Sequence, residues 1–467
     1  MGIITRIKGW INMIFKGKVK DEFDVESIVS AAVERRIKDC ADIYKGNPPW
    51  LDEENNIKTV NFAKSICSET ARLATLGIKV QIGGSARGDY LQKVIDKYYF
   101  DMRNWVEYAS AYGTIVLKPT LDGIECVLPG DYMVTESKDG KITGIVFIDR
   151  EREGKKFFTR LEYHRFVDNI YWITNKCYVG DSENDLNESV DIEKTPWNEL
   201  LEEVGIEKME SPLYGVLKMP QANNIDPQSP MTFAVFSEAI EELKDLDIAY
   251  SRNSEEIYDS SRTVLMDADR LIPTGTKVST TANGFESAKK IMGLPKYIKN
   301  VYGDGVNSFY QEINPSLNTE TRLTGINALL SQIGFKCGFS NGYFVFNEKT
   351  GMITATQVES DDRRTIHFIK DVRDKLECCL RDLMYAINVY ADLYQLAPVG
   401  VYEIVYDFGD ITYNREEDRA RWYGYAASNR IPFWYYLVKF EGMTEEDAKA
   451  LVEEATPKEP TLFGREE

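Results

Sequence analysis

The chain has 467 residues, of which 43% are hydrophobic and 12% aromatic, so it can fold into about two to four domains. Its formal net charge of -19 argues against a tight DNA binder, because such proteins replace phosphate counterions with basic side chains. Seven cysteines without CxxC spacing indicate reduced thiols and no zinc site. No apolar run reaches the roughly 20 residues of a membrane-spanning helix.

Residues 1–24 are expected to form an N-terminal arm. One helical face would carry five apolar side chains, namely Ile3, Ile7, Trp10, Ile11 and Ile14. Lysines follow at positions 16, 18 and 20, so the helix could lie on a membrane surface. Docking on a neighbouring subunit is the better interpretation, and no membrane partner is expected.

The next two hundred residues predict helices followed by an antiparallel sheet. Helical spacing runs from Val25 to Lys79 with a break at Asn47–Trp50, and a second helix covers Tyr90–Ala111. Short β-rich runs punctuated by Gly, Asp and Pro then indicate a meander. These runs are Thr114–Lys118, Gly123–Leu128, Tyr132–Thr135, Ile142–Ile148, Phe157–Phe166 and Asn169–Ile173.

Two helices enclose a small insertion in the middle of the chain. An acidic amphipathic helix is predicted from Phe233 to Ser261, and a second one runs from a cap at Ser316 to a stop at Gly338. The insertion between them, residues 262–315, begins with a strand-like run at Thr263–Met266. It contains several lysines, among them Lys289, Lys290, Lys296 and Lys299.

The longest predicted helix covers Gln357 to Leu393. It follows extended arms at Tyr343–Phe346 and Met352–Thr356, which indicate a hairpin or a loop. A seven-residue repeat of apolar side chains predicts a packing seam for helices of this chain or of a neighbour. The repeat consists of Ile369, Leu376, Leu383 and Tyr390. A strand at Tyr402–Tyr406, helices at Arg415–Ser428 and Glu445–Glu454 and a flexible tail at 456–467 complete the chain.

One motif matches the pattern of a catalytic serine. Residues 338–342 read G-x-S-x-G around Ser340, and Asp361 and His367 follow in the order used by some hydrolases. That motif needs a strand before the serine and a helix after it, whereas a helix precedes Ser340 here. The acidic cluster at 359–362 could serve a nuclease, but it suits a helix N-terminus better. With two histidines and no P-loop, we expect no enzymatic activity, no metal and no cofactor.

The order of these elements and several short stretches resemble the portal proteins of long-tailed bacteriophages, over roughly residues 25–455. The resemblance rests on the combination and order of these stretches. The stretches are Asn61–Lys64, Ala239–Ser261, Phe335–Phe339, Ile353–Val358, Tyr406–Asp410 and Gly442–Ala448.

The resemblance implies an α+β portal-type fold with an antiparallel sheet and paired stem helices. It divides the chain into a helix-rich wing at 25–232, stem helices at 233–261 and 316–338, and a small α/β clip at 262–315. A tunnel loop at 339–356, a long wing helix and strand at 357–406, and a short helical crown at 407–455 would follow.

The resemblance also implies a non-enzymatic function. Twelve copies would form a ring at one capsid vertex of the virion, after assembly in the host cytoplasm, and double-stranded DNA would pass through it. The implied partners are the terminase large subunit, the head–tail connector, and the major capsid and scaffold proteins. Another phage-like connector is the main alternative, and a serine hydrolase at Ser340 is a remote one.

Three sets of residues become candidates on this basis. Channel-lining candidates are Glu238, Glu241, Glu242 and Asp245. Tunnel-loop candidates are Asn341, Asn347, Glu348 and Lys349. Candidates for contact with the packaging motor are Lys289, Lys290, Lys296 and Lys299. Acidic side chains suit a channel wall because carboxylates repel phosphate.

Overall fold

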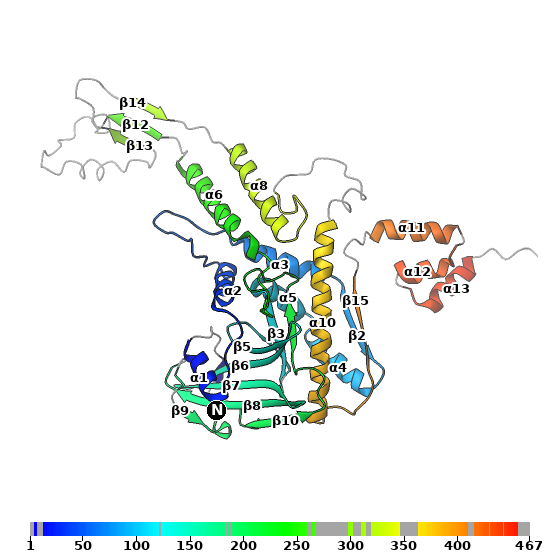
Figure 1. Cartoon of the computed structure of the whole chain (residues 1–467). Helices are drawn as coiled ribbons and strands as arrows, with labels where there is room; N and C mark the ends of the chain where they lie inside the picture. The colour runs from blue at the N-terminus through cyan, green and yellow to red at the C-terminus, as the bar shows by residue number, and fades with distance from the viewer. Residues whose placement is uncertain are drawn as a thin grey trace, which may run out of the picture. The chain divides into compact units, whose positions relative to one another are not determined.

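A computed structural model of the chain has an α+β fold (Figure 1). It describes residues 4–6, 13–120, 123–182, 185–186, 188–259, 263–267, 298–301, 310–313, 319–345, 363–409, 415–428, 430–441 and 443–455. The chain divides into two compact units. The larger comprises Met1–Thr75 with Val80–Tyr406, and the smaller comprises Leu76–Lys79 with Asp407–Glu467.

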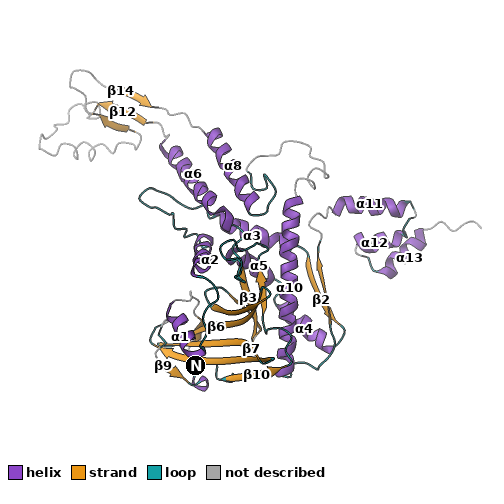
Figure 2. Ribbon diagram, in the orientation of Figure 1, coloured by secondary structure: helices purple, strands orange, loops and turns teal. Residues whose placement is uncertain are grey.

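A seven-stranded antiparallel sheet forms the base of the larger unit (Figure 2). Its order is β1-β6-β7-β8-β10, with β5 paired to β6 and β9 paired to β8. The strands are β1 (Ile4–Arg6), β5 (Tyr132–Lys138), β6 (Lys141–Glu153), β7 (Lys156–Val167), β8 (Ile170–Gly180), β9 (Glu188–Val190) and β10 (Glu203–Glu207). The predicted meander is therefore confirmed for the four runs from Tyr132 to Ile173, whereas the first two predicted runs, Thr114–Lys118 and Gly123–Leu128, belong to a separate sheet.

Both faces of this sheet are buried. Along β6, Val146 and Ile148 face a cluster that contains α1 (Met13–Phe23), whereas Ile145 and Phe147 face a cluster that contains α2 (Ala31–Tyr44). Neighbouring residues of a strand point to opposite faces, so burial of both faces removes the alternation of apolar and polar residues.

The N-terminal helix packs on its own chain through Phe15 and Val19. Phe15 and Val19 of α1 are fully buried against the sheet, whereas Ile14 is 54% exposed. Ile14, the one member of the predicted stripe within the described residues, is exposed, so the stripe stays a prediction. The pair at i and i+4 that docks α1 is Phe15 and Val19. The other members of the predicted stripe, Ile3, Ile7, Trp10 and Ile11, lie outside the described residues.

A group of helices and a smaller sheet lie beside the large sheet. The helices are α2, α3 (Phe62–Ala74), α4 (Ala86–Lys97) and α5 (Asp101–Tyr112). The small sheet has the order β11-β3-β4, with β3 at Thr114–Thr120, β4 at Gly123–Val127 and β11 at Gly215–Lys218. Short 3-10 turns cover Ile192–Lys194 and Ser237–Ala239.

The single helix predicted for Tyr90–Ala111 is in fact two, α4 and α5. Tyr98 caps the end of α4, its ring stacks on Trp105 at 5.9 Å, and its hydroxyl accepts a hydrogen bond from the Ile124 amide at 2.9 Å. These tertiary contacts break a helix that local periodicity would have continued.

Two antiparallel helices lie side by side in the middle of the chain (Figure 1). They are α6 (Ile240–Asp259) and α8 (Thr319–Lys336). The chain between them contributes β12 (Thr263–Asp267), β13 (Ile298–Val301) and β14 (Tyr310–Ile313). Strand β12 pairs with β13 in parallel and with β14 antiparallel.

The helix predicted from Phe233 begins later, because residues 233–236 are held in an irregular segment. Val235 donates its amide hydrogen to Ser110 O at 2.9 Å, and Gln221 Nε2 donates to Val235 O at 3.0 Å. Phe233 and Phe236 are buried on this segment. Their apolar character therefore reflects tertiary packing and not a helical stripe.

Helix α10 (Arg363–Leu393) carries the predicted seven-residue seam. Ile369, Leu376 and Leu383 are fully buried, and α10 packs against α3, α4, β3 and β11 of the same chain. The seam is therefore covered within the chain. Residues 346–362, which include the predicted arm at Met352–Thr356 and the predicted start of this helix, lie outside the described residues. The helix is followed by β15 (Glu403–Phe408), which pairs with β2 (Ile78–Gly83).

Two buried arginines bond backbone carbonyls around α10. Arg87 of α4 is 1% exposed and donates to the carbonyl oxygens of Asn388, Ala397 and Pro398 at 2.8, 2.8 and 3.0 Å. Arg373 of α10 donates to the Leu73 and Ala74 carbonyls, each at 3.0 Å. Leu73 and Ala74 end α3, and the last carbonyls of a helix lack partners within the helix, so Arg373 satisfies groups that would otherwise be buried unpaired. Arg87 instead ties α10 to the loop that follows it.

The smaller unit contains α11 (Arg415–Ala427), α12 (Phe433–Glu441) and α13 (Glu445–Ala455). Tyr436, Leu437 and Phe440 of α12 are buried with Ala426 and Ala448 of the flanking helices. Sequence analysis placed α11 and α13 but assigned no element to α12. That helix is rich in aromatic residues, which have only modest helix propensity, so its helical state depends on packing.

Candidate functional site

Helices α6 and α8 form a pair with buried leucines and ion pairs across it. Leu243 and Leu246 of α6 and Leu330 of α8 are each at most 3% exposed. Lys336 Nζ lies 2.5 Å from Glu242 Oε1, and Arg322 pairs with Glu256 nearer the other end of the pair. These basic side chains of α8 are thereby directed onto acidic residues of α6.

The four channel-lining candidates are not equivalent. Glu238, Glu241 and Asp245 are exposed and lie on one stripe, at spacings of three and four residues. Glu242 differs, because its side chain is 13% exposed and also accepts a hydrogen bond from Gln332 Nε2 at 3.1 Å. Glu242 therefore differs from the other three candidates in holding α8 to α6.

A long loop fixes the rotation of α6. Asp247, which is 3% exposed, accepts hydrogen bonds at 2.9 Å from Trp50 Nε1 and from the Val60 amide. One turn later, Ser251 Oγ accepts from the Lys58 amide at 2.9 Å. The loop between α2 and α3 thus holds one side of α6. The exposed carboxylates of Glu241 and Asp245 remain on another side of the helix.

The end of α8 is a glycine-terminated helix stop. Gly338 has a φ of 89°, its amide donates to Phe335 O at 3.2 Å, and the Phe339 amide donates to Gly334 O at 2.9 Å. This pair of hydrogen bonds defines a Schellman motif, whose left-handed residue is usually glycine. The predicted stop at Gly338 is confirmed.

Ser340 lies in a buried junction with the first turn of α10. It is 4% exposed, its amide donates to Thr365 Oγ1 at 2.8 Å, and its hydroxyl lies 3.0 Å from the same atom. His367 is exposed on α10, and Asp361 lies outside the described residues. The described contacts of Ser340 are those of a structural junction, with a helix before the serine as the sequence predicted.

Aromatic side chains pack the residues after α8 against their surroundings. Phe339 lies 4.8 Å from Phe344 and 5.7 Å from Phe368 of α10, measured between ring centroids. Phe344 also contacts Phe62 of α3 at 5.2 Å. The first residues of the predicted tunnel loop therefore form a base packed on α3 and α10, and this part is not an extended arm.

Most of the other candidates lie outside the described residues. This holds for Asn347, Glu348 and Lys349 of the tunnel loop and for Lys289, Lys290 and Lys296 of the clip. Lys299 lies on β13, opposite Leu265 in the strand register. Asn341 is exposed, and its side chain accepts a hydrogen bond from Ser331.

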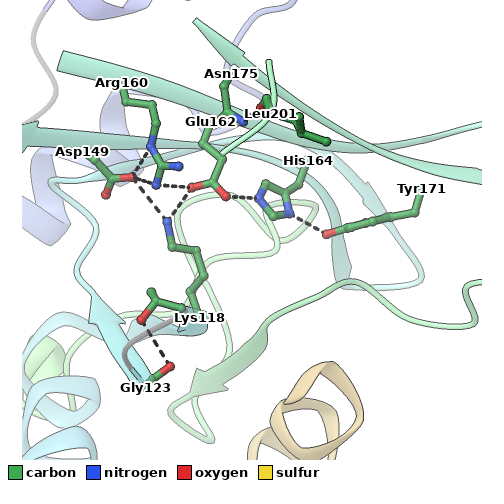
Figure 3. A network of polar contacts seen from close by, with 10 residues as sticks. Lys118, Gly123, Asp149, Arg160, Glu162, His164, Tyr171, Asn175 and Leu201 are labelled. Atoms are coloured by element: carbon green, nitrogen blue, oxygen red, sulfur yellow. Dashed lines mark hydrogen bonds and ion pairs between the residues drawn. The ribbon is translucent and has the colours of Figure 1, made fainter. Parts of the chain in front are cut away.

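A buried polar network, which sequence analysis missed, joins the two sheets (Figure 3). Lys118 of β3 is 2% exposed, and its Nζ lies 2.7 Å from Glu162 and 3.5 Å from Asp149. Arg160 bonds the same two carboxylates, at 2.9 and 2.6 Å. Two cations therefore balance two anions among buried side chains.

The charges of this network stabilise one another. Burial alone would raise the pKa of Glu162, but Arg160 and Lys118 override it and hold this pKa well below 4.5. Burial would likewise lower the pKa of Lys118, but Asp149 and Glu162 raise it above 10.5. Both groups are therefore ionised at neutral pH.

His164 extends the network in its neutral form. Burial lowers its pKa below 6.5, although the hydrogen bond to Glu162 opposes the shift. An ionised Glu162 can only accept, so His164 Nε2 donates to it at 2.9 Å. His164 Nδ1 then accepts from the Tyr171 hydroxyl at 2.8 Å, and that oxygen accepts from the Leu213 amide at 3.0 Å. Every member of this chain is satisfied by one tautomer.

The described residues can be searched for metal-ligand clusters and for membrane-spanning helices. Within them, no group of three or more His, Cys, Asp or Glu side chains is arranged to hold a metal ion. None of the helices in the described ranges combines the length and apolarity needed to cross a bilayer. All seven cysteines are free thiols.

Comparisons with known proteins give little further information. No protein-family model matches the chain, and no curated protein matches it. One similar solved chain comes from a structure titled "Neck of native GTA particle computed with C12 symmetry". It is 11% identical, the alignment covers 94% of this chain and 98% of that one, and the TM-score is 0.43. A similarity at this level carries no argument about the function of this chain.

Proposed function

We propose that this chain is the portal subunit of a long-tailed bacteriophage or a related particle. In this proposal, twelve copies form a ring at one capsid vertex, through which double-stranded DNA is packaged and ejected. The ring docks the terminase motor first and the head–tail connector later, and it contacts the capsid and scaffold proteins. The chain catalyses no reaction itself.

The observation that carries the proposal is the antiparallel pair α6–α8 with its exposed acidic stripe. A channel for DNA needs a rigid wall that does not bind phosphate. The helix pair supplies rigidity through its buried leucines and its two cross-helix ion pairs. Glu241 and Asp245 supply exposed negative charge, and the basic Lys336 and Arg322 are neutralised by α6.

The first test is assembly. Twelve chains of 53.4 kDa give a ring of about 640 kDa, which mass photometry of the purified protein resolves from smaller species. A closed ring is the expected result at micromolar concentration. Only monomers and dimers in a series of salt concentrations would overturn the proposal.

The second test asks whether the acidic stripe faces DNA. We expect the double variant Glu241→Lys with Asp245→Lys to form rings that bind duplex DNA. Each added phosphate contact steepens the log–log salt dependence of binding by about 0.9. The control is Glu193→Lys with Glu199→Lys, which makes the same charge change at exposed positions outside the helix pair.

The two variants separate a channel wall from a general effect of charge. The stripe is the wall if only the α6 variant binds DNA more tightly and slows packaging. Equal binding by both variants shows that the effect is not specific to α6, and the channel assignment then fails. Intact wild-type rings that support no packaging would favour a connector that lacks a role in motor docking.

A further inference from the structure

Two strongly exposed apolar surfaces lie on the larger unit. Val399, Phe100 and Val401 are 86%, 86% and 85% exposed, the highest values among the large hydrophobic side chains that the structure describes. We call Val399, Val401 and Glu403 the valine surface, and Tyr99, Phe100 and Arg103 the Phe100 surface. Exposed apolar patches of this kind mark interaction sites in soluble proteins.

The valine surface belongs to a loop that is held firmly in place. Residues 393–402 contain no charged side chain, although 28% of the whole chain is charged. Buried Arg87 bonds the carbonyls of Ala397 and Pro398 in this loop. Gly400 packs so closely on the start of α4 that an added Cβ would lie 2.6 Å from Ser85 Oγ. The contacts of this loop with Arg87 and Ser85 therefore hold Val399 and Val401 in exposed positions.

The Phe100 surface is held equally well. It follows Tyr98, whose ring stacks on Trp105 and whose hydroxyl bonds the Ile124 amide. The rings of Tyr99 and Phe100 lie edge to face with their centroids 5.3 Å apart. This turn thus presents two aromatic side chains in a fixed arrangement. Aromatic residues are enriched at protein interfaces.

The two surfaces cannot cover each other within one chain. Gly400 of the valine-surface loop lies at the start of α4, whereas the Phe100 surface follows the end of that helix. Twelve helical residues separate these ends by about 18 Å. The side chains of Phe100, Val399 and Val401 therefore remain exposed in a single chain.

The surfaces carry complementary charges beside their apolar residues. Glu403 is exposed two residues after Val401, so both side chains point to the same side of an extended segment. Arg103 is exposed one helical turn after Phe100. The valine surface thus carries the negative charge of Glu403, and the Phe100 surface carries the positive charge of Arg103.

We propose that the valine surface of one copy packs against the Phe100 surface of the next copy. Such a contact uses two different surfaces, and heterologous contacts of this kind generate rings when they close. The inference rests on the proposed ring and names a contact that joins its neighbouring subunits. Val399 and Val401 pack on the rings of Tyr99 and Phe100, and Glu403 pairs with Arg103.

Disulfide crosslinking tests the contact. The exposed Cys378 is first changed to Ser to remove a competing thiol. Val399→Cys and Phe100→Cys are then combined in that background and oxidised with copper phenanthroline. We expect a ladder of linked subunits on a non-reducing gel. The control combines Val399→Cys with Leu201→Cys, because Leu201 is also well exposed, at 67%.

The outcomes separate this inference from the proposed ring. Rings without the ladder overturn the contact and leave the ring intact, whereas wild-type protein that forms no ring removes the proposed function itself. A ladder in the control pair, or a dimer formed by Val399→Cys alone, also overturns the heterologous contact.

A second variant measures the strength of the contact without introducing thiols. Val399→Lys with Val401→Lys changes only exposed side chains, so the fold should persist. We expect the concentration at which rings dissociate to rise about tenfold or more, because central apolar anchors dominate interface energies. Unchanged ring dissociation in a folded variant contradicts the proposal.

Discussion

Replacing Lys118 with Met should destabilise the joint between the two sheets. Lys118 is 2% exposed and contacts both carboxylates of the buried network. Its removal leaves Arg160 alone against Asp149 and Glu162, so the network acquires one uncompensated negative charge. The substitution also removes the ammonium group that lies 4.5 Å from the centre of the Phe147 ring.

The expected cost follows from the burial of these groups. Removing one partner from a buried ion pair costs about 3–5 kcal/mol, because the remaining charge stays desolvated without a partner. A surface pair would cost about 0–1 kcal/mol. The matched control is Lys118→Met with Glu162→Gln, which restores neutrality with Arg160 and Asp149. We expect this double variant to recover at least half of the lost stability.

Hydrogen exchange is the appropriate assay, because a chain with two compact units need not unfold in one step. The opening free energies of amides in β3 and β7 should fall in the single variant and partly recover in the double variant. All proteins are compared in the same assembly state. A single variant that costs less than about 1 kcal/mol, or a double variant that is no better, would refute an account based on buried charge.

Three further predictions follow from the described contacts. The pKa of His164 in the folded state lies below 6.5, so the unfolded state binds the proton first as the pH falls. The free energy of unfolding should therefore fall by up to about 1.4 kcal/mol per pH unit below about pH 6.5. Urea titrations should show this loss in the wild type and less of it in His164→Gln. Arg87→Met should speed hydrogen exchange in the last turns of α10, whereas Arg373→Met should do so at the end of α3. Uniform effects on both helices would contradict separate roles for the two arginines. Ser340→Ala should lower the free energy of unfolding by about 1–3 kcal/mol, because it removes the hydroxyl that contacts Thr365. Neither the wild type nor this variant should hydrolyse an activated ester. Turnover by the wild type that disappears in the variant would support the hydrolase alternative.

The periodicity of apolar residues predicted those strands and helices whose positions are set by the local sequence. The strands from Thr114 to Ile173 and the helices at Arg415 and Glu445 appear close to where the pattern placed them. The misses occur where long-range contacts override the pattern, as at Tyr98, which ends α4, and at Phe233, which is buried in an irregular segment. A helical stripe and a packed loop both need apolar residues, so composition alone cannot distinguish them.

The candidate site was predictable only to the level of which helix carries the acidic residues. The sequence places Glu242 beside Glu241, but their different environments depend on where α8 lies. Likewise, Lys118, Glu162 and His164 resemble the surface residues of half-buried strands. Their burial depends on two features of the tertiary structure. The strand register sets His164 of β7 opposite Ile145 of β6, and β3 packs over this part of the sheet. One weak signal was available, since a lysine within the apolar run at Thr114–Lys118 requires an acidic partner if that strand is buried.

The buried network and the acidic stripe represent opposite uses of charge in one chain. Four charges in the network are desolvated, so they must balance, and their positions fix how β3 packs on β6 and β7. The carboxylates of Glu241 and Asp245 stay in water and need no partner, so they can accumulate on one helix face at little cost. A chain with a net charge of -19 can therefore fold stably, because its excess negative charge need not enter the core. The same separation lets the acidic face of α6 change without loss of the fold, and for this reason charge reversal there is a clean test of the channel.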